Sequence, residues 1–257
     1  MIRLLLPTNI EEIMKIKALG FEFRTNLWAI SLYLLLLAGL LSLGCWQLNR
    51  AEQKREFLAQ QQAGQQAPII NLNQSAIGER YQAAEMTGHY DGAHSFLIDN
   101  QIIDGKPGYF VVTPFILDKQ DKAVLVNRGW VPLTANRQQL PDVSINSEIV
   151  AIKGRINQFP SVGYKLAGGE IPTETWPAVV QFIDSQVLSA KLAYPLYDFQ
   201  IELDDDQTAG FVRHWHTQAT IPPEKHQAYA VQWFGLAVTL TGLFIWISTR
   251  KRREHSA

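Results

Sequence analysis

Two long apolar stretches stand out in the pattern of hydrophobic and polar positions. They cover Leu27–Gln47 and Ala228–Ser248, and each contains 21 residues without a charged side chain. A helix of 21 residues rises roughly 31 Å, which is about the thickness of the hydrocarbon core of a bilayer. Trp46 and Trp246 lie near ends of these stretches, and membrane interfaces favour tryptophan. The pattern therefore predicts two transmembrane helices. We place them at residues 25–48 and 228–248.

The chain between the two stretches has a different pattern. Glu52–Gln66 is polar and rich in Gln and Ala, which predicts that the first helix continues beyond the membrane until Pro68 ends it. Short runs rich in Val, Ile, Phe and Tyr then alternate with Gly, Asp, Asn and Pro, as consecutive strands and turns do. The predicted strands are Tyr81–Tyr90, Ser95–Ile103, Tyr109–Leu117, Ala123–Val131, Glu148–Asn157, Phe199–Leu203 and Phe211–Gln218.

Turns and one short helix complete this middle region. The residues at Asp91–Gly92, Asp104–Gly108 and Asp118–Asp121 tolerate or pre-set the backbone angles that turns require. Asp184–Leu192 is predicted as the helix. We therefore expect a mostly antiparallel β domain, barrel-like because closure removes exposed strand edges. The fold class is a two-helix transmembrane hairpin that carries this domain.

Basic residues beside the stretches predict the orientation of the chain. Arg250–Arg253 follow the second stretch, whereas only Arg213 and Lys225 precede it closely, so the positive-inside rule places the C-terminus in the cytoplasm. The first stretch has three basic residues on each side and does not decide. With two spans both termini are cytoplasmic, and the β domain lies in the periplasm of a bacterium whose inner membrane holds the chain. The predicted segments are 1–24 in the cytoplasm, 49–227 in the periplasm and 249–257 as a basic cytoplasmic tail.

Two processed forms of the first stretch are alternatives to a membrane anchor. A secretory signal peptide usually has a shorter apolar region followed by an A-x-A site, and no such site follows Leu27–Gln47. A lipoprotein signal would use Cys45, but only the Gly-Cys pair of Ser42–Cys45 fits that pattern. An anchor is therefore favoured, with Cys45 as a small residue facing lipid or the other helix.

The composition of the chain excludes several functions. Among 257 residues, 23 Lys and Arg stand against 24 Asp and Glu, which gives a net charge of −1. A nucleic-acid binder needs a basic surface, and the only dense basic run here lies beside the second stretch. The single cysteine excludes an intramolecular disulfide, a CxxC redox pair and covalent c-type haem attachment. The motifs GxSxG, HExxH and GxxxxGK(S/T) do not occur in the sequence, so no common catalytic class is indicated.

Three groups of polar residues in the β domain suggest chemistry, and each also has a structural interpretation. His214 and His216 would face one side of a strand. They could bind a metal or serve an anchored enzyme, but no third ligand or catalytic set is indicated. Asp204–Asp206 lack the ligand spacing of a calcium loop and are expected to form a solvated acidic turn. Arg128 could pair with a buried acid or present its guanidinium to a ligand.

The outer ends of the two predicted helices bring aromatic and polar residues to one depth, because the end of the first helix faces the start of the second in a hairpin. Residues three and four apart share a helix face, which groups His226, Tyr229 and Trp233 on one face and Trp46 and Arg50 on another. The residues expected at this boundary are Trp46, Gln47, Arg50, His226, Tyr229, Gln232 and Trp233.

This boundary has the components of a haem site. An imidazole nitrogen of His226 could ligate the iron. Trp46 and Trp233 could contact the porphyrin, while Arg50 or Lys225 could meet its propionates. A histidine that serves only as a polar anchor at the interface is the alternative that these residues leave open.

Four segments of the sequence resemble one known family. They are residues 44–50 (GCWQLNR), 108–115 (GYFVVTPF), 124–132 (VLVNRGWVP) and 226–234 (HQAYAVQWF). In this order and spacing, within a frame of two apolar stretches, they resemble the Surfeit locus protein 1 family over about residues 23–250. The match is weak over residues 161–206, so family contacts there are not carried over.

The resemblance implies a function and a set of site residues. It implies an assembly factor for haem-copper terminal oxidases, especially cytochrome c oxidase, that assists haem a delivery or insertion into the largest oxidase subunit and is not an enzyme. His226 occupies the position implicated in haem a binding, and its ring would ligate the iron transiently. Asn127, Arg128 and Gly129 match a characteristic motif, in which we expect the glycine to permit a turn or a close backbone approach.

The resemblance also implies partners and leaves a second function open. The implied partners are the largest subunit of the haem-copper oxidase, enzymes of haem a biosynthesis as further candidates, and membrane lipid. The alternative is a membrane scaffold that stabilises the nascent oxidase subunit without haem. In that case Gln47 and Gln232 would hydrogen-bond to a partner helix, since amides within a membrane seek partners.

Overall fold

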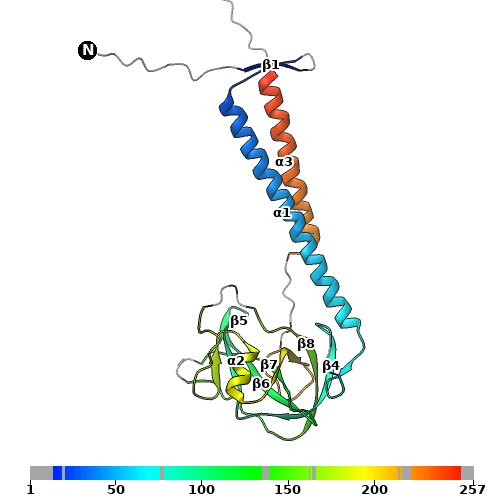
Figure 1. The fold of residues 1–257 in the computed structure, drawn as a ribbon, viewed down its shortest axis with the longest axis vertical. Coiled ribbons are helices and arrows are strands. Elements are labelled where there is room, and N and C mark those ends of the chain that lie inside the picture. Colours follow the sequence, from blue (N-terminus) through cyan, green and yellow to red (C-terminus); the bar gives the residue numbers. More distant parts are fainter. Residues whose placement is uncertain are drawn as a thin grey trace, which may run out of the picture. The chain divides into compact units, whose positions relative to one another are not determined.

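The computed structural model of the chain describes residues 14–18, 21–75, 78–134, 139–161, 163, 166–213, 215 and 221–249. The chain divides into two compact units, which we describe separately (Figure 1). The helical unit contains residues 1–57 and 219–257, and the β unit contains residues 58–218. His214, His216 and the basic run Arg250–Arg253, which the sequence analysis singled out, lie outside the described residues.

The helical unit consists mainly of two helices that are long and apolar enough to cross a membrane. α1 covers Leu27–Gln66 and α3 covers Pro223–Thr249, so each contains one of the two apolar stretches. The first helix starts two residues later than the predicted span 25–48, and the second starts five residues before the predicted 228. The side chain of Asn26 caps α1, because its Oδ1 accepts a hydrogen bond of 2.9 Å from the Ala29 amide. Pro223 occupies the first position of α3, where its missing amide hydrogen is not needed.

The two helices lie side by side (Figure 1), and aromatic and hydroxyl groups join them. The rings of Tyr33 and Phe244 stack with centroids 4.3 Å apart. The Tyr33 hydroxyl lies 3.2 Å from Thr241 Oγ1, which itself donates to the Ala237 carbonyl. The two membrane helices therefore form the hairpin that the sequence predicts. Before α1 in the chain, β1 (Met14–Ala18) and β2 (Phe21–Thr25) form a small antiparallel sheet, which was not predicted from the sequence.

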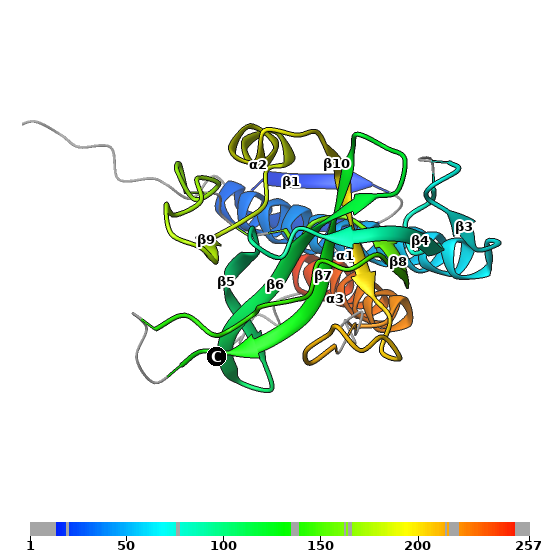
Figure 2. The same cartoon turned by 90° about the horizontal axis from the view of Figure 1, so that it is seen from below.

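The β unit is a closed barrel with additional strands. β4, β8, β10, β7 and β6 are hydrogen-bonded in this order, and a pairing of β6 with β4 closes the circle (Figure 2). β5 and β9 continue outward from β6, and β3 flanks β4. The strands are β3 (Ile70–Asn71), β4 (Ala83–Tyr90), β5 (Phe96–Ile103), β6 (Lys106–Leu117), β7 (Ala123–Pro132), β8 (Val150–Asn157), β9 (Ala178–Val180) and β10 (Leu196–Leu203). The predicted barrel-like domain is thus confirmed.

Both faces of β7 are covered, which explains its continuous apolar run. Val124 and Val126 point into the barrel core with Tyr90, Phe115 and other buried residues. Ala123 and Leu125 point to the opposite face, into a second core that includes residues of β9 and α2. α2 covers Ser185–Leu192, which confirms the helix predicted over Asp184–Leu192, and the Asp184 side chain caps it.

The structure corrects some of the predicted elements. Phe211–Gln218 is not a strand over its described residues, because only Val212 pairs, in an isolated bridge with Trp130. β10 begins at Leu196 rather than Phe199, and it runs parallel to β7 in a barrel whose other pairings are antiparallel. The turn before β6 contains only Asp104 and Gly105, which both have positive φ angles. The short strands β3 and β9 were missed because two or three residues carry no readable period.

Candidate functional site

The imidazole of His226 is held by a hydrogen bond across the hairpin. His226 lies in the first turn of α3, and its Nδ1 is 2.7 Å from Oε1 of Gln47 in α1. An amide oxygen only accepts hydrogen bonds, so Nδ1 carries the proton in this contact. The lone pair of the neutral ring is then on Nε2, the nitrogen that remains for a ligand. The hydrogen bond thus fixes both the tautomer and the orientation of the ring.

A cavity of about 360 Å³ adjoins His226 in the helical unit. Arg50, Gln53 and Lys54 line it from α1, and Ile221 lines it from the segment before α3. Arg50 donates a hydrogen bond of 3.2 Å to Gln53 Oε1. The cavity therefore combines an imidazole with two cationic side chains and an apolar side chain. Cations in such a position favour a ligand with carboxylate groups.

The aromatic residues predicted for this site do not line the cavity. The Trp46 ring lies 5.7 Å from the Arg50 guanidinium, which links it to the cavity through a cation–π contact. Trp46 is exposed over 51% and Tyr229 over 44% of their surface, and Trp233 is half-buried. In a helix that crosses a membrane, these side chains face lipid or a partner.

The structure brings together some of the predicted residues and adds others. It unites His226, Gln47 and Arg50, whereas Gln232 and Lys225 are exposed and do not line the cavity. Gln53, Lys54 and Ile221 also line the cavity, although they were not among the predicted site residues. A signal for the first two was available, because they follow Arg50 by three and four positions in a helix predicted to continue past the span.

The two helices approach each other closely beside this site. A β-carbon built on Gly44 would lie 2.5 Å from the ring of Phe234, much closer than atoms in contact allow. Gly44 therefore permits the packing of α1 against α3 one turn away from Gln47. Small residues serve the same purpose in membrane helix pairs generally.

Arg128 in the β unit has a structural environment. It is 3% exposed, and it donates to the carbonyls of Ala209 and Val143 at 2.8 Å and to the Thr113 hydroxyl at 3.3 Å. Its guanidinium lies 5.0 Å from the ring of Phe211. Burial lowers the pKa of Arg128 to about 10, so the side chain remains charged at neutral pH. Among the described residues no carboxylate pairs with it, and its partners are the chain's own carbonyls and hydroxyl.

Asn127 and Gly129 shape the strand around Arg128. The register of β7 on β6 shifts between Gly129 and Asn127, which leaves Arg128 as the extra residue of a bulge. The Asn127 side chain accepts from the Gly129 amide at 3.1 Å. Gly129 has a φ of +112°, and an added β-carbon would lie 2.7 Å from the Val212 carbonyl oxygen. A glycine is thus required here by both backbone angle and space.

The other polar candidates do not form a metal site within the described part of the chain. No group of three His, Cys, Asp or Glu residues there could hold a metal ion. In the acidic turn after β10, Arg213 donates to the carbonyls of Asp204, Asp205 and Gln207 at 2.6–2.8 Å. Burial is the main cause that raises the pKa of Asp204. These contacts explain the turn as a structural feature.

The family comparison covers a range that includes the four sequence segments described above. A model of the SURF1 family matches residues 34–238. The chain is 29% identical to a SURF1-like protein of Rickettsia felis over 219 residues, 80% of this chain and 90% of that protein. It is 30% identical over 94 residues to the cytochrome oxidase assembly protein SHY1 of Saccharomyces cerevisiae, 35% of this chain and 24% of that protein. It is 31% identical over 153 residues to Surfeit locus protein 1 of Arabidopsis thaliana, 54% of this chain and 43% of that protein. Because the matched region includes most of the two helices and the β unit between them, we conclude that this chain belongs to the SURF1 family.

Proposed function

We propose that this chain is a membrane-bound assembly factor for cytochrome oxidase, and that it holds haem a transiently at His226. Family membership and the name of the yeast relative, a cytochrome oxidase assembly protein, support the assembly role. The hydrogen bond from His226 to Gln47 is the observation that carries the haem role, because a ring that donates through Nδ1 has its Nε2 left for a metal ligand bond, and His226 lines a cavity.

The residues of the cavity fit the chemistry of haem a. Haem supplies an iron centre that accepts an imidazole nitrogen, and its propionates are anionic. Arg50 and Lys54 provide two positive charges beside His226, which suits two carboxylates. The exposed apolar surface of the two helices, including Trp46 and Tyr229, suits the ring edge and an alkyl tail.

A single protein ligand suits a carrier better than a permanent haem site. His226 is the only histidine that lines this cavity among the described residues. One axial bond leaves the cargo exchangeable, whereas two strong ligands would favour retention. The proposed recipient is the largest subunit of the oxidase, with the β unit in the outer compartment and both termini in the cytoplasm. The chain's residues would bind and orient the haem without altering it.

Bound haem in purified variants tests this proposal. The full chain and its variants are purified from cells that produce haem a, and the haem stoichiometry and absorption spectrum are compared. His226→Ala should lose the bound haem. Gln47→Leu should weaken binding about 10-fold or more, as loss of a partner that orients a metal-bound histidine typically does. The matched control is Gln232→Leu, which changes an exposed glutamine of α3 and should leave haem binding unchanged.

Two outcomes would contradict the haem role. Haem binding that is unchanged in His226→Ala removes this residue from the function. A chain that contains no haem yet rescues the oxidase in a deletion strain, with His226→Ala equally active, would establish the scaffold alternative instead. Difference spectra of the membranes, measured together with total haem a, separate failed insertion from failed synthesis.

A further inference from the structure

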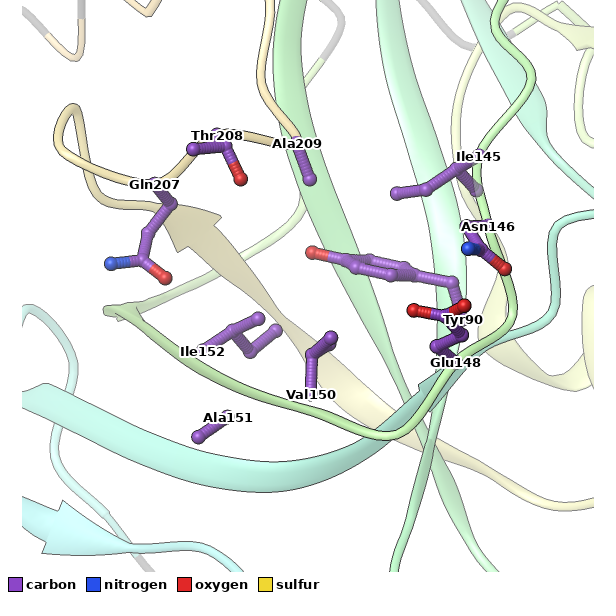
Figure 3. Close-up of a pocket in the computed structure, with 10 residues that line it drawn as sticks. All are labelled: Tyr90, Ile145, Asn146, Glu148, Val150, Ala151, Ile152, Gln207, Thr208 and Ala209. Carbon is purple, nitrogen blue, oxygen red and sulfur yellow. The ribbon is translucent and has the colours of Figure 1, made fainter.

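A second cavity, of about 320 Å³, lies in the β unit. Its walls come from the end of β4, from residues 145–152 that lead into β8, and from the turn 207–209 after β10 (Figure 3). Side chains of Ile145, Val150 and Ile152 make much of this wall apolar. The cavity is large enough for a small molecule rather than for water alone.

The Tyr90 side chain forms part of the wall of this cavity, and its hydroxyl lies just behind the accessible surface without a hydrogen-bond partner among the described residues. The residue is 1% exposed, and among the described residues its hydroxyl is the only buried side-chain oxygen or nitrogen atom without a partner. Figure 3 shows the hydroxyl pointing into the space between Ala209 and Ile152. Buried hydroxyl groups are normally paired, and an unpaired one is unfavourable. The Tyr90 hydroxyl can therefore donate to an acceptor that the described residues do not supply.

The surroundings keep the hydroxyl in this position and in its donor form. The Tyr90 ring contacts the ring of Phe115 edge-on at 4.9 Å, and the Arg128 guanidinium lies 5.8 Å from its centre. Burial raises the pKa of Tyr90 to about 12 although Arg128 and Arg213 lower it by their charge. The phenol thus remains protonated at neutral pH and can donate.

The lining of the cavity favours an uncharged ligand. Much of the wall is apolar, and an ion would lose its hydration there. Arg128 and Arg213 act on the buried end of Tyr90, where they oppose a cation. Glu148 also lines the cavity but is exposed, where solvent screens its charge. The apolar walls and the protonated hydroxyl therefore suit a neutral molecule with an oxygen acceptor.

We propose that this pocket binds a small, uncharged and mainly apolar molecule whose carbonyl oxygen accepts a hydrogen bond from Tyr90 Oη. Less than 1 Å² of the hydroxyl is accessible, so the ligand reaches it through a side-chain rearrangement in the wall. This site lies within the β unit and does not depend on haem binding at His226.

Acetophenone and ethylbenzene are suitable probes, because they have nearly the same shape and only the first has a carbonyl group. The full chain is placed in lipid nanodiscs with ¹³C-labelled alanine methyl groups. Ala151 and Ala209 line the pocket, whereas Ala178 is buried in the other core and reports on folding. Methyl signals of these residues report occupancy of the pocket itself, independent of partitioning into lipid.

We expect acetophenone to shift the signals of Ala151 and Ala209 saturably. Tyr90→Phe should weaken acetophenone binding by about 5- to 10-fold, the effect of one buried hydrogen bond, and leave ethylbenzene binding unchanged. Tyr197→Phe, which removes a hydroxyl bonded to Gln120 rather than one at the pocket, is the matched control. Val150→Phe, at the partly exposed wall, should block both probes and serves if Tyr90→Phe does not fold.

Two results would overturn this site. The first is the absence of saturable shifts at Ala151 and Ala209 in the wild type. The second is equal acetophenone affinity in the wild type and Tyr90→Phe, which would mean that a buried water satisfies the hydroxyl. Neither result would bear on the proposed haem site, because His226 lies in the helical unit and is tested by its own variants.

Discussion

Apolar residues face inward in one unit of the molecule and outward in the other. Val124 and Leu125 lie next to each other in β7 and are both 0% exposed, because each face of the strand is covered by a separate core. Leu35 in α1 is 70% exposed and Val238 in α3 is 73% exposed. Their side chains match a lipid environment, as expected for helices that cross a membrane. The β unit therefore carries its own stability in its packing, whereas the helical unit depends on its surroundings and on a few specific contacts.

This difference separates the residues that hold the fold from those proposed for function. In the β unit, buried polar residues such as Arg128 are surrounded by partners. In the helical unit, His226 and Gln47 form a polar contact between the helices beside a cavity that is open to a ligand. Substitutions should consequently reduce stability most in the β unit, and those at the His226 cavity should change binding with little effect on folding.

The largest loss of stability is expected for Arg128→Met. Methionine fills similar space but leaves the carbonyls of Ala209 and Val143 and the hydroxyl of Thr113 without this donor. We expect a decrease of about 3–5 kcal/mol in the free energy of unfolding. It is measured by chemical denaturation of the full chain in detergent, followed by near-ultraviolet circular dichroism. The control Arg50→Met, in the helical unit, should change this transition by less than about 0.5 kcal/mol. A loss below about 1 kcal/mol for Arg128→Met would contradict its structural role.

Gly129→Ala is expected to have the next largest effect. Alanine at a φ of +112° is strained, and its β-carbon would meet the Val212 carbonyl oxygen. The combination should cost about 2–4 kcal/mol. Gly105→Ala separates the two causes, because Gly105 has a φ of +73° with open space around it, and should cost only about 1 kcal/mol. Equal losses in the same denaturation experiment would show that the close approach at Gly129 is unimportant.

The sequence predicted the parts of the fold that depend on regular patterns. The two apolar stretches, the extension of α1 to Gln66 and most strands followed from periodicity and from turn residues. The closure of the barrel between β4 and β6 fitted the expected form, although the parallel pairing of β10 with β7 did not follow. Parallel pairing is decided by contacts distant in sequence, which a local pattern does not contain.

The candidate site was predicted in part for a similar reason. Depth in a hairpin places Gln47 near His226, and the structure joins them by a hydrogen bond. Depth alone does not fix rotation about a helix axis. Trp46, Tyr229 and Trp233 were expected around one ligand, but the cavity is lined instead by Gln53, Lys54 and Ile221. The Tyr90 cavity was not predicted at all, because it forms between segments 55 or more positions apart in the chain.

Alkaline pH should weaken the β unit through Tyr90. Its pKa is about 12 in the folded chain, against 10.0 for an ordinary tyrosine. The folded state therefore favours the protonated form, and this contribution to stability is present below pH 10 and lost as the pH rises to 12. The loss amounts to about 2–3 kcal/mol for two pKa units. Between pH 9 and pH 12 the wild type should therefore lose that much more stability than Tyr90→Phe. Burial also raises the pKa of Tyr194, but this tyrosine is present in both proteins and its effect cancels in the comparison. Parallel pH profiles of the two proteins would show that Tyr90 does not titrate as a buried group.

The smallest loss of stability is expected for Tyr33→Phe in the membrane hairpin. This variant tests whether the helical unit depends less on its internal contacts than the β unit does. Thr241 Oγ1 donates to the Ala237 carbonyl, so the contact with Tyr33 uses the tyrosine as donor. Phenylalanine removes this hydrogen bond but keeps the stacking on Phe244. Hydrogen bonds between membrane helices contribute about 0.6 kcal/mol on average, and the loss of stability should be of that size.

The stability of the helix pair is measured by titration with sodium dodecyl sulfate in mixed micelles. Energy transfer between labels at Ser31 and Ile245 follows the helix pair, after Cys45→Ser removes the native thiol. A loss above about 2 kcal/mol would exceed what such a bond contributes, and the hairpin would then rely on specific polar contacts as strongly as the β unit does.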